Sequence, residues 1–492
     1  MLIHLIVATL VSSPIASPAE SRVSAKAPVM WASDAAVAGQ APATPEQKPK
    51  KAKKPKKEKK AKAAGEETPA PDEEVDPDVV EPVRRGDGFT WKQHPSIRYG
   101  SNFRLDFQAK LQEDAHASYP DADGLKDAVT GEPKVFDLHR NRIGIEGRLF
   151  KHIDFEVERE LTEKELTERE ILQGIPSQSQ WKDVNVNVDY IKNAQIQVGK
   201  FKIPFGLDEL TGDSHNDFVY RSLGASYLSS ARDVGLMVHG RFFKRGLSYS
   251  AGVFAHDGDN ARSKKIEGGD ETVAARVSGV PFRKVGVPGL ELGTAFTVSK
   301  LSDDSFRPNG LRGRTVMTQD TFFEPVYVKG QRRRWEGDAD WTAGPVSMRT
   351  EFTQVIDQRQ GQGFGGEDLP DVRARSWYLT GTWIVTGEEK TRPVKAANDF
   401  LQGGFGAVEL AARYERIWYD SVGEGQVFRG PRAENVQGSG DRVLTLGVSW
   451  TLNRFIKLQV NGIRERVEDP DRSPVANGAA FWSRVFRLQL VL

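Results

Sequence analysis

Apolar and polar residues alternate with a period of two along most of the chain. Ile143 and Ile145, for example, alternate with Arg142 and Glu146. Successive residues of a β-strand point to opposite faces of the sheet, so this period predicts strands with one apolar and one charged face. The pattern therefore indicates an all-β protein in which the two faces of the sheet meet different surroundings.

The alternation divides into sixteen segments. They span residues 99–109, 138–150, 153–160, 183–191, 194–201, 234–243, 246–256, 271–280, 289–299, 332–342, 345–355, 375–386, 406–418, 442–452, 455–466 and 481–492. Long connections follow the odd-numbered segments and short ones follow the even-numbered segments, with 387–405 as the exception. Long loops at one end and tight turns at the other are typical of outer-membrane barrels. The pattern therefore predicts a 16-stranded antiparallel transmembrane β-barrel.

The two strand faces predict what lies on each side of the barrel wall. An apolar face suits lipid outside, and a charged face suits water inside. Sixteen strands enclose a lumen too wide for side chains to fill, so we expect an aqueous channel. Tryptophans near strand ends fit an aromatic girdle at the lipid headgroups. They are Trp335, Trp341, Trp383, Trp418, Trp450 and Trp482.

The connection after segment 194–201 is about thirty residues long, and connections of that length tend to be functional or disordered. Pro204 and Gly206 interrupt regular strand pairing at its start. It carries both aromatic and basic side chains, including Phe218 and Arg221. We therefore expect this loop to pack against another part of the protein.

Several stretches of the chain resemble one known family. They are VGKFKIPFG, YRSLG and ARDVGLMVHG within residues 193–240, SWYLTG at 376–381, LGVSWTLNRFIKLQVN at 446–461, and the terminal RVFRLQLVL. Together they resemble the phosphate-selective porin O/P family, an outer-membrane porin family, over residues 99–492. The resemblance implies an inward-folded constriction loop lined by basic residues, a trimeric assembly, and passage of small anions through the outer membrane of a Gram-negative-type bacterium.

The first part of the chain differs in composition from the rest. Residues 1–19 contain a short apolar core followed by small residues, which predicts a secretory signal peptide. Residues 20–88 are rich in Lys, Pro, Ala and Glu, so we predict a disordered linker ahead of a barrel at 89–492. The lysine-rich block is either a solvated tether or a docking segment for an anionic envelope polymer or lipid. Nucleic acid is a poor partner, because no aromatics interleave with the lysines.

Composition and motifs exclude several kinds of chemistry. The 492 residues include no cysteine, which excludes disulfides and thiolate catalysis. The sequence contains no HExxH, GxSxG or GxxxxGK[ST] motif. Acidic turns that begin at Asp121 and Asp257 do not complete a calcium-loop pattern. We therefore expect no enzyme activity, no cofactor and no metal site.

The remaining chemistry is electrostatic selection inside a pore, since rings of Arg or Lys favour anions. The candidate pore and anion-binding residues are Lys200, Lys202, Arg221, Arg232, Arg142, Arg148, Arg334, Arg349 and Arg413. For each, the alternative is an ion pair that holds the loop to the wall. Inward-facing acids are at least as numerous, and a turn at Ala343-Gly344 would set Arg349 opposite Asp338.

The sequence thus predicts a passive outer-membrane porin for small hydrophilic solutes, with a preference for anions such as phosphate or polyphosphate. The expected partners are outer-membrane lipid, the small anionic solutes and two further copies in a homotrimer. The alternative is a structural or adhesive barrel whose lysine-rich tail tethers the cell envelope.

Overall fold

The computed structural model describes residues 87–91, 94–119, 136–162, 180–243, 246–258, 271–281, 287–302 and 308–492. The predicted signal peptide and the lysine-rich block lie outside these residues, as does the acidic turn that begins at Asp121. None of the helices among the described residues is long and apolar enough to cross a membrane.

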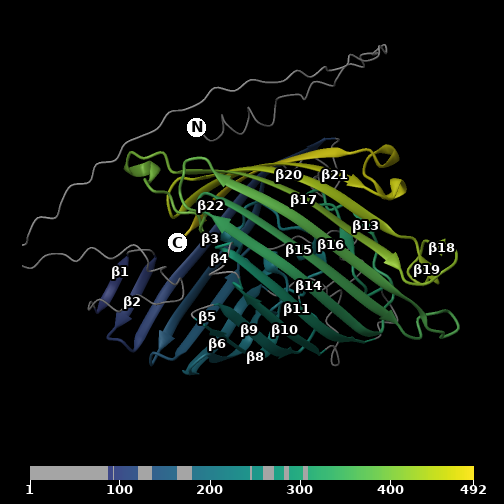
Figure 1. The fold of residues 1–492 in the computed structure, drawn as a ribbon, viewed down its shortest axis with the longest axis horizontal. Coiled ribbons are helices and arrows are strands. Elements are labelled where there is room, and N and C mark those ends of the chain that lie inside the picture. The colour runs from purple at the N-terminus through teal and green to yellow at the C-terminus, as the bar shows by residue number, and fades with distance from the viewer. Residues whose placement is uncertain are drawn as a thin grey trace, which may run out of the picture. The chain divides into compact units, whose positions relative to one another are not determined.

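Antiparallel strands close into a barrel, as predicted. The main sheet has 18 strands, and β22 pairs back with β3, so that the first and last strands of the barrel meet. Sixteen strands form the wall; β1 and β2 are the other two (Figure 1). The wall strands are β3 (Phe103–Tyr119), β4 (Phe136–Leu149), β5 (Ile153–Glu160), β6 (Trp181–Ile191), β7 (Ala194–Lys202), β8 (Arg232–Phe242), β9 (Leu247–Phe254), β10 (Thr272–Gly279), β11 (Leu290–Leu301), β14 (Gly330–Ala343), β15 (Val346–Arg359), β16 (Leu369–Ile384), β17 (Ala407–Ser421), β20 (Ser439–Thr451), β21 (Ile456–Val467) and β22 (Phe481–Val491).

A short hairpin, β1 (Gly88–Trp91) and β2 (Pro95–Tyr99), precedes the barrel and was not predicted. The first half of β3 pairs with β2, with Ser96 opposite Asp106, and its second half pairs with β22. Both hairpin strands are too short to show a clear period of two, so the sequence pattern did not separate β2 from the first wall strand. That wall strand begins at Phe103 rather than at Tyr99, which is the last residue of β2.

The strand faces are divided as predicted. Outward positions carry exposed apolar side chains such as Val186, Leu236 and Val448, whereas inward positions carry charged groups such as Glu336. Five of the six predicted girdle tryptophans lie toward strand ends, and Trp335 lies further inside β14. Closure leaves no unpaired strand edge facing hydrocarbon, which a bilayer would penalise.

The long connections leave one end of the barrel and the short turns leave the other. In Figure 1, β18 (Val427–Phe428) and β19 (Asn435–Val436) lie at the long-loop end, opposite the β1–β2 hairpin. The segment 385–406 is the expected exception, because it is long but leaves from the turn end. These two ends provide the frame for locating the functional residues.

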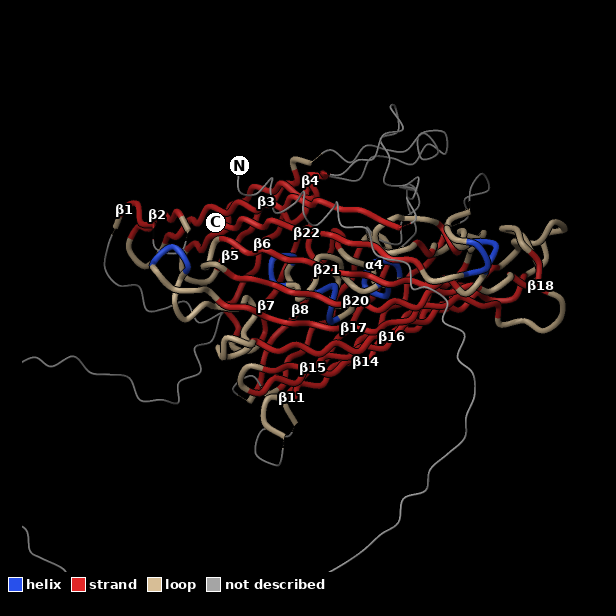
Figure 2. Tube along the Cα trace, turned by 90° about the horizontal axis from the view of Figure 1, so that it is seen from above, coloured by secondary structure: helices blue, strands red, loops and turns tan. Residues whose placement is uncertain are grey.

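Two segments fold into the lumen. The loop 203–231 contains α3 (Leu207–Leu210) and α4 (Leu223–Tyr227), and α4 contacts β16 and β17 (Figure 2). A second segment, 308–329, contains β12 (Gly313–Arg314) and β13 (Thr321–Phe323) and was not predicted.

The two segments build an apolar core inside the barrel. Toward the long-loop end, several inward positions of the wall strands are apolar and form one cluster with both segments. Other inward positions at that end, such as Arg332 and Asp441, are charged and buried. Members of this core from the wall, the loop 203–231 and the segment 308–329 are Val355, Ile417, Val443, Ile463, Val485, Leu223, Leu228, Val316, Met317, Phe322 and Phe323. The expectation of a uniformly charged, water-filled interior therefore needs correction at that end of the barrel.

Candidate functional site

The loop 203–231 is held across the lumen by side chains of the wall. Acidic side chains accept hydrogen bonds from its backbone N–H groups. The donor and acceptor pairs are Gly206 with Glu336 at 3.1 Å, Asp208 with Glu351 at 3.0 Å and Leu223 with Glu415 at 2.6 Å. Three carboxylates on three different strands thus fix the position of the loop.

Basic side chains of the wall donate to the carbonyl groups of the same loop. Arg334 donates to the carbonyl of Leu228 at 2.8 Å, and Arg413 donates to that of Tyr220 at 3.2 Å. Both guanidinium side chains are almost completely buried. Of the candidate pore bases, Arg334 and Arg413 therefore serve as anchors of the loop.

Four other candidate bases, Lys202, Arg221, Arg232 and Arg142, lie together with further bases of the wall. Asp213 is at their centre, 2.8 Å from Arg142, 2.6 Å from Arg221 and 3.6 Å from Arg140. We call the surrounding bases the constriction cluster, and they come from β3, β4, β7, β8 and the loop. Its members are Lys110, Arg140, Arg142, Lys202, Arg221 and Arg232.

The acidic partners of the constriction cluster are more buried than most of its bases. The side chain of Lys110 is 24% exposed, whereas that of its partner Glu158 is 3% exposed. Arg140 is 18% exposed and Asp213 is 8% exposed. Apart from Arg142, each base of the cluster is more exposed than the carboxylates with which it pairs, although Arg232 exceeds Asp183 only slightly.

The charges of this site fix the ionisation of the loop residues. Burial raises the pKa of the Asp213 carboxyl, but Arg140, Arg221 and Arg142 outweigh it and hold that pKa well below its usual range. Burial lowers the pKa of His215, and the nearby Lys110 lowers it further. At neutral pH the site therefore contains an ionised Asp213 and an uncharged His215.

A second ionic group lies where the loop meets the turn-end connection 385–406. Lys390 of that connection is 2.6 Å from Asp217 of the loop and also pairs with Glu409. Arg392 lies 3.6 Å from Asp217. The long even-numbered connection therefore reaches into the barrel and fixes the loop from the other end.

The register around Arg349 differs from the predicted one. Arg349 lies opposite Asp340, 2.7 Å away, and not opposite Asp338. The turn is Gly344-Pro345 rather than Ala343-Gly344, and a shift of one residue at a turn moves every partner by two.

The remaining candidates lie apart from the constriction cluster. Lys200 pairs with Val184 and Val234, which are exposed on the outer face, so it faces away from the lumen. Arg148 faces inward near the turn end, where Asp154 binds it through 2.5 and 2.8 Å contacts. The structure thus brings together Lys202, Arg221, Arg232 and Arg142 of the predicted set, but not Lys200 or Arg148.

Sequence reasoning missed several inward-facing bases. Lys110, Arg140 and Lys457 face inward, and Lys457 donates to the loop carbonyl of Asn216 at 2.7 Å. The alternation of Lys110 and Lys457 with outward-facing residues could have identified both as inward-facing. For Lys390, in an irregular connection, no periodic signal exists.

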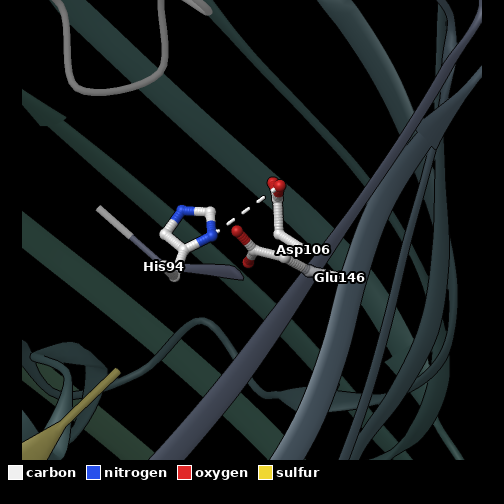
Figure 3. Close-up of side chains that lie close together, drawn as sticks. All are labelled: His94, Asp106 and Glu146. Atoms are coloured by element: carbon white, nitrogen blue, oxygen red, sulfur yellow. Dashed lines mark ion pairs between the residues drawn. The ribbon is translucent and has the colours of Figure 1, made fainter. Parts of the chain in front are cut away.

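One group of side chains in the described part of the chain has the spacing of metal ligands. His94, Asp106 and Glu146 lie close together near the start of the barrel (Figure 3). Arg104, however, lies 2.8 Å from Asp106, which already accepts a hydrogen bond from Ser96. A cation in that position disfavours a metal ion, so we assign this group to anchoring the β1–β2 hairpin.

Asp257, at the start of the second predicted acidic turn, is also fully paired. Its oxygens bind Arg332 at 2.6 Å and Arg334 at 2.7 Å. Its carboxylate therefore bridges two buried guanidinium groups of β14, and Asp357 also pairs with Arg332.

Comparisons with known proteins identify one family and several similar solved structures. The sequence model for phosphate-selective porin O and P matches residues 107–490. Among curated proteins, none matches the chain. Solved structures with a similar fold include OmpT of Vibrio cholerae, with 10% identity and a TM-score of 0.49 over 81% of this chain and 100% of that one. An anion-selective porin from Comamonas acidovorans has 13% identity and a TM-score of 0.46 over 79% of this chain and 100% of its own. The outer-membrane channel DcaP of Acinetobacter baumannii has 8% identity and a TM-score of 0.48 over 80% of this chain and 99% of its own.

The family match covers well over half of the chain and includes every strand of the wall from β4 to β21. The chain therefore belongs to the phosphate-selective porin O and P family, and it is an outer-membrane channel for small solutes in Gram-negative bacteria.

Proposed function

We propose that the channel prefers small hydrophilic anions such as phosphate. The observation that carries this proposal is the difference in exposure within the constriction cluster. Most of its basic groups are more exposed than the carboxylates with which they pair, such as Glu158 and Asp213. An ion in the constriction would therefore meet positive charge first.

The arginines of the cluster also suit a phosphate ligand. A guanidinium can donate two parallel hydrogen bonds to phosphate oxygens. A wide, water-filled pore would not offer such a pair of hydrogen bonds to the ion. Solutes would pass down their gradient without chemical change. By family resemblance, we further propose that three copies assemble into a homotrimer.

Reversal potentials of the purified protein in a planar bilayer under a KCl gradient test the anion preference. We expect the sign of an anion-selective channel and a decrease of chloride current when phosphate is added. A reversal potential of the opposite sign, with no effect of phosphate, would remove the preference.

Variants test whether the anion preference comes from the constriction cluster. Lys110→Met and Arg140→Gln remove charge at the most exposed bases of the cluster, so together they should shift the reversal potential toward zero. Arg159→Gln with Arg333→Gln is the matched control, because it also removes two charges and both arginines are exposed on the outer face. A shift of equal size in the control would assign the effect to the overall charge of the protein.

A further inference from the structure

The strands β16, β17, β20, β21 and β22 are neighbours in the wall (Figure 1). Arginines gather on their outward face. We call them the outer arginine belt. Its members are Arg373, Arg375, Arg416, Arg442, Arg464, Arg466 and Arg484. Strand pairing makes them contiguous: Arg416 lies directly opposite Arg442, which lies directly opposite Arg466.

The belt lies toward the long-loop end of the wall. Its members occupy the halves of their strands that are nearer the long loops. Outward positions nearer the turns are apolar and exposed, as at Leu379, Leu410 and Val448. Arginine on the lipid-facing surface costs about 2–4 kcal/mol at the bilayer midplane and about 0–1 near its interfaces. The belt therefore lies at the level of the headgroups of the outer leaflet, because long loops leave the extracellular end.

The belt carries more positive charge than its surroundings neutralise. Like charges directly opposite one another destabilise a sheet. Arg484 has other interactions and is left out of the charge comparison. The remaining six arginines are accompanied by three acids, Asp371 and Asp420 on the outward face of these strands and Glu468 directly after β21, which leaves three positive charges in excess. Glu468 alone bridges Arg416 and Arg442, at 2.8 Å from each. A further anion is needed to complete the row.

Aromatic rings support the belt. The guanidinium groups of Arg375 and Arg416 lie 5.0 and 4.7 Å from the ring centre of Trp418. A hollow of about 300 Å³, lined by Trp418, Glu468 and Pro470 among others, opens beside them. Cation–π contacts hold guanidinium groups in a fixed orientation, which favours binding of a phosphate by two parallel hydrogen bonds.

Outward bases at the long-loop end also occur outside the belt, as at Lys200 of β7, Lys300 of β11 and Arg333 of β14. None of these three lies directly opposite another base on a neighbouring strand. The belt differs because Arg416, Arg442 and Arg466 form a contiguous row across three strands. Such a row can contact the phosphates of one bound molecule together.

We propose that the outer arginine belt binds the phosphate groups of a phosphorylated glycolipid in the outer leaflet of the membrane. The inference depends on the membrane location and the fold, and it is independent of which solute the channel conducts. The lipid supplies the anions that the Arg416, Arg442 and Arg466 row lacks, and its acyl chains meet the apolar surface below.

Native mass spectrometry of the full protein with added bisphosphorylated lipid A tests the proposal. Arg442→Gln with Arg466→Gln should weaken binding about thirtyfold, the effect of removing two interfacial charges. The matched control is Arg159→Gln with Arg333→Gln, since both arginines lie on the outer face but outside the belt. This control should bind within about twofold of the parent. Both pairs are on the surface, and heat-modified gel mobility checks that each barrel is folded.

Four outcomes overturn the proposal. The first is equal lipid binding by the parent and the belt variant. The second is equal binding of a dephosphorylated lipid A, because the phosphates would then be irrelevant. The third is a change of oligomeric state in the belt variant with unchanged lipid binding, which would make this face an interface between copies. Binding of inorganic phosphate alone, with the same loss in the belt variant and no gain from the lipid, would also assign the belt to a free anion.

Discussion

Lys390 lies 2.6 Å from Asp217, although the two residues belong to segments that enter the barrel from opposite ends. The loop 203–231 comes from the long-loop end and the connection 385–406 from the turn end. The side chain of Lys390 is completely buried, and Glu409 binds it from β17. One ammonium group therefore joins the loop, the wall and the connection in a single ionic group.

Replacing Lys390 by methionine should destabilise the barrel strongly. The substitution leaves the carboxylates of Asp217 and Glu409 buried close to one another without this partner. Breaking a buried ion pair by removing one partner costs about 3–5 kcal/mol. Urea unfolding of the protein in detergent micelles measures this cost.

The same connection offers a matched control for that substitution. Lys395 is exposed, so Lys395→Met should change the free energy of unfolding by less than about 0.5 kcal/mol. Equal effects of the two substitutions would show that Lys390 does not join the three segments.

Asp213→Asn should make the channel more selective for anions. The side chain neutralises Arg140, Arg142 and Arg221, and asparagine keeps its shape without its charge. The gain of one net positive charge at the constriction should move the reversal potential closer to that of a channel that conducts only anions. Asp471→Asn is the control. The side chain of Asp471 is 69% exposed on a loop, and its ion-pair partner Arg429 is not a member of the constriction cluster. An unchanged potential in Asp213→Asn would place the selective step elsewhere.

The same carboxylate predicts a specific dependence of stability on pH. Burial raises the pKa of Asp213, but the three arginines outweigh it and keep the pKa well below its usual range. A group with a depressed pKa in the folded state stabilises the fold above its unfolded-state pKa, and this contribution is lost as the pH falls through the folded-state pKa. The unfolded-state pKa of an aspartate is about 3.9.

The difference in unfolding free energy between the parent and Asp213→Asn should therefore stay constant from about pH 7 to about pH 5 and decrease only as the pH falls below about 4. Urea titrations of both proteins at several pH values measure this difference. Using the difference cancels the titration of other acids. A decrease that is complete by about pH 5 would contradict an ionised, arginine-bound Asp213.

The barrel could be predicted because its signal is local. The residues 153–160 were assigned from alternation alone, and β5 has the same bounds. The alternation of long and short connections then showed which end of each strand lies at the loop end of the barrel and which lies at the turn end. The β1–β2 hairpin was missed because strands of four and five residues show no clear period, and the register at Arg349 was missed because turns shift by one residue without changing either strand pattern.

The candidate site could be predicted only in part, for a different physical reason. Alternation determines which face a residue occupies, so it places Arg142 inside and would also have placed Lys200, two residues after Val198, outside. It does not determine which inward bases a folded-in loop will cover. Arg334 and Arg413 became anchors because the loop 203–231 packs on them, and that depends on contacts between residues far apart in the chain.

The second inward segment should matter for both stability and conductance. Phe323 of the segment 308–329 stacks on Tyr419 of β17, with ring centres 4.3 Å apart. Phe323→Ala should cost about 3–5 kcal/mol, as expected for a buried phenylalanine, and should raise the single-channel conductance because the segment that fills this end of the lumen loosens. Phe364→Ala is the control, because Phe364 is 90% exposed. Urea unfolding and planar-bilayer recording measure the two effects. A loss of stability with unchanged conductance would show that the segment supports the wall but does not narrow the channel.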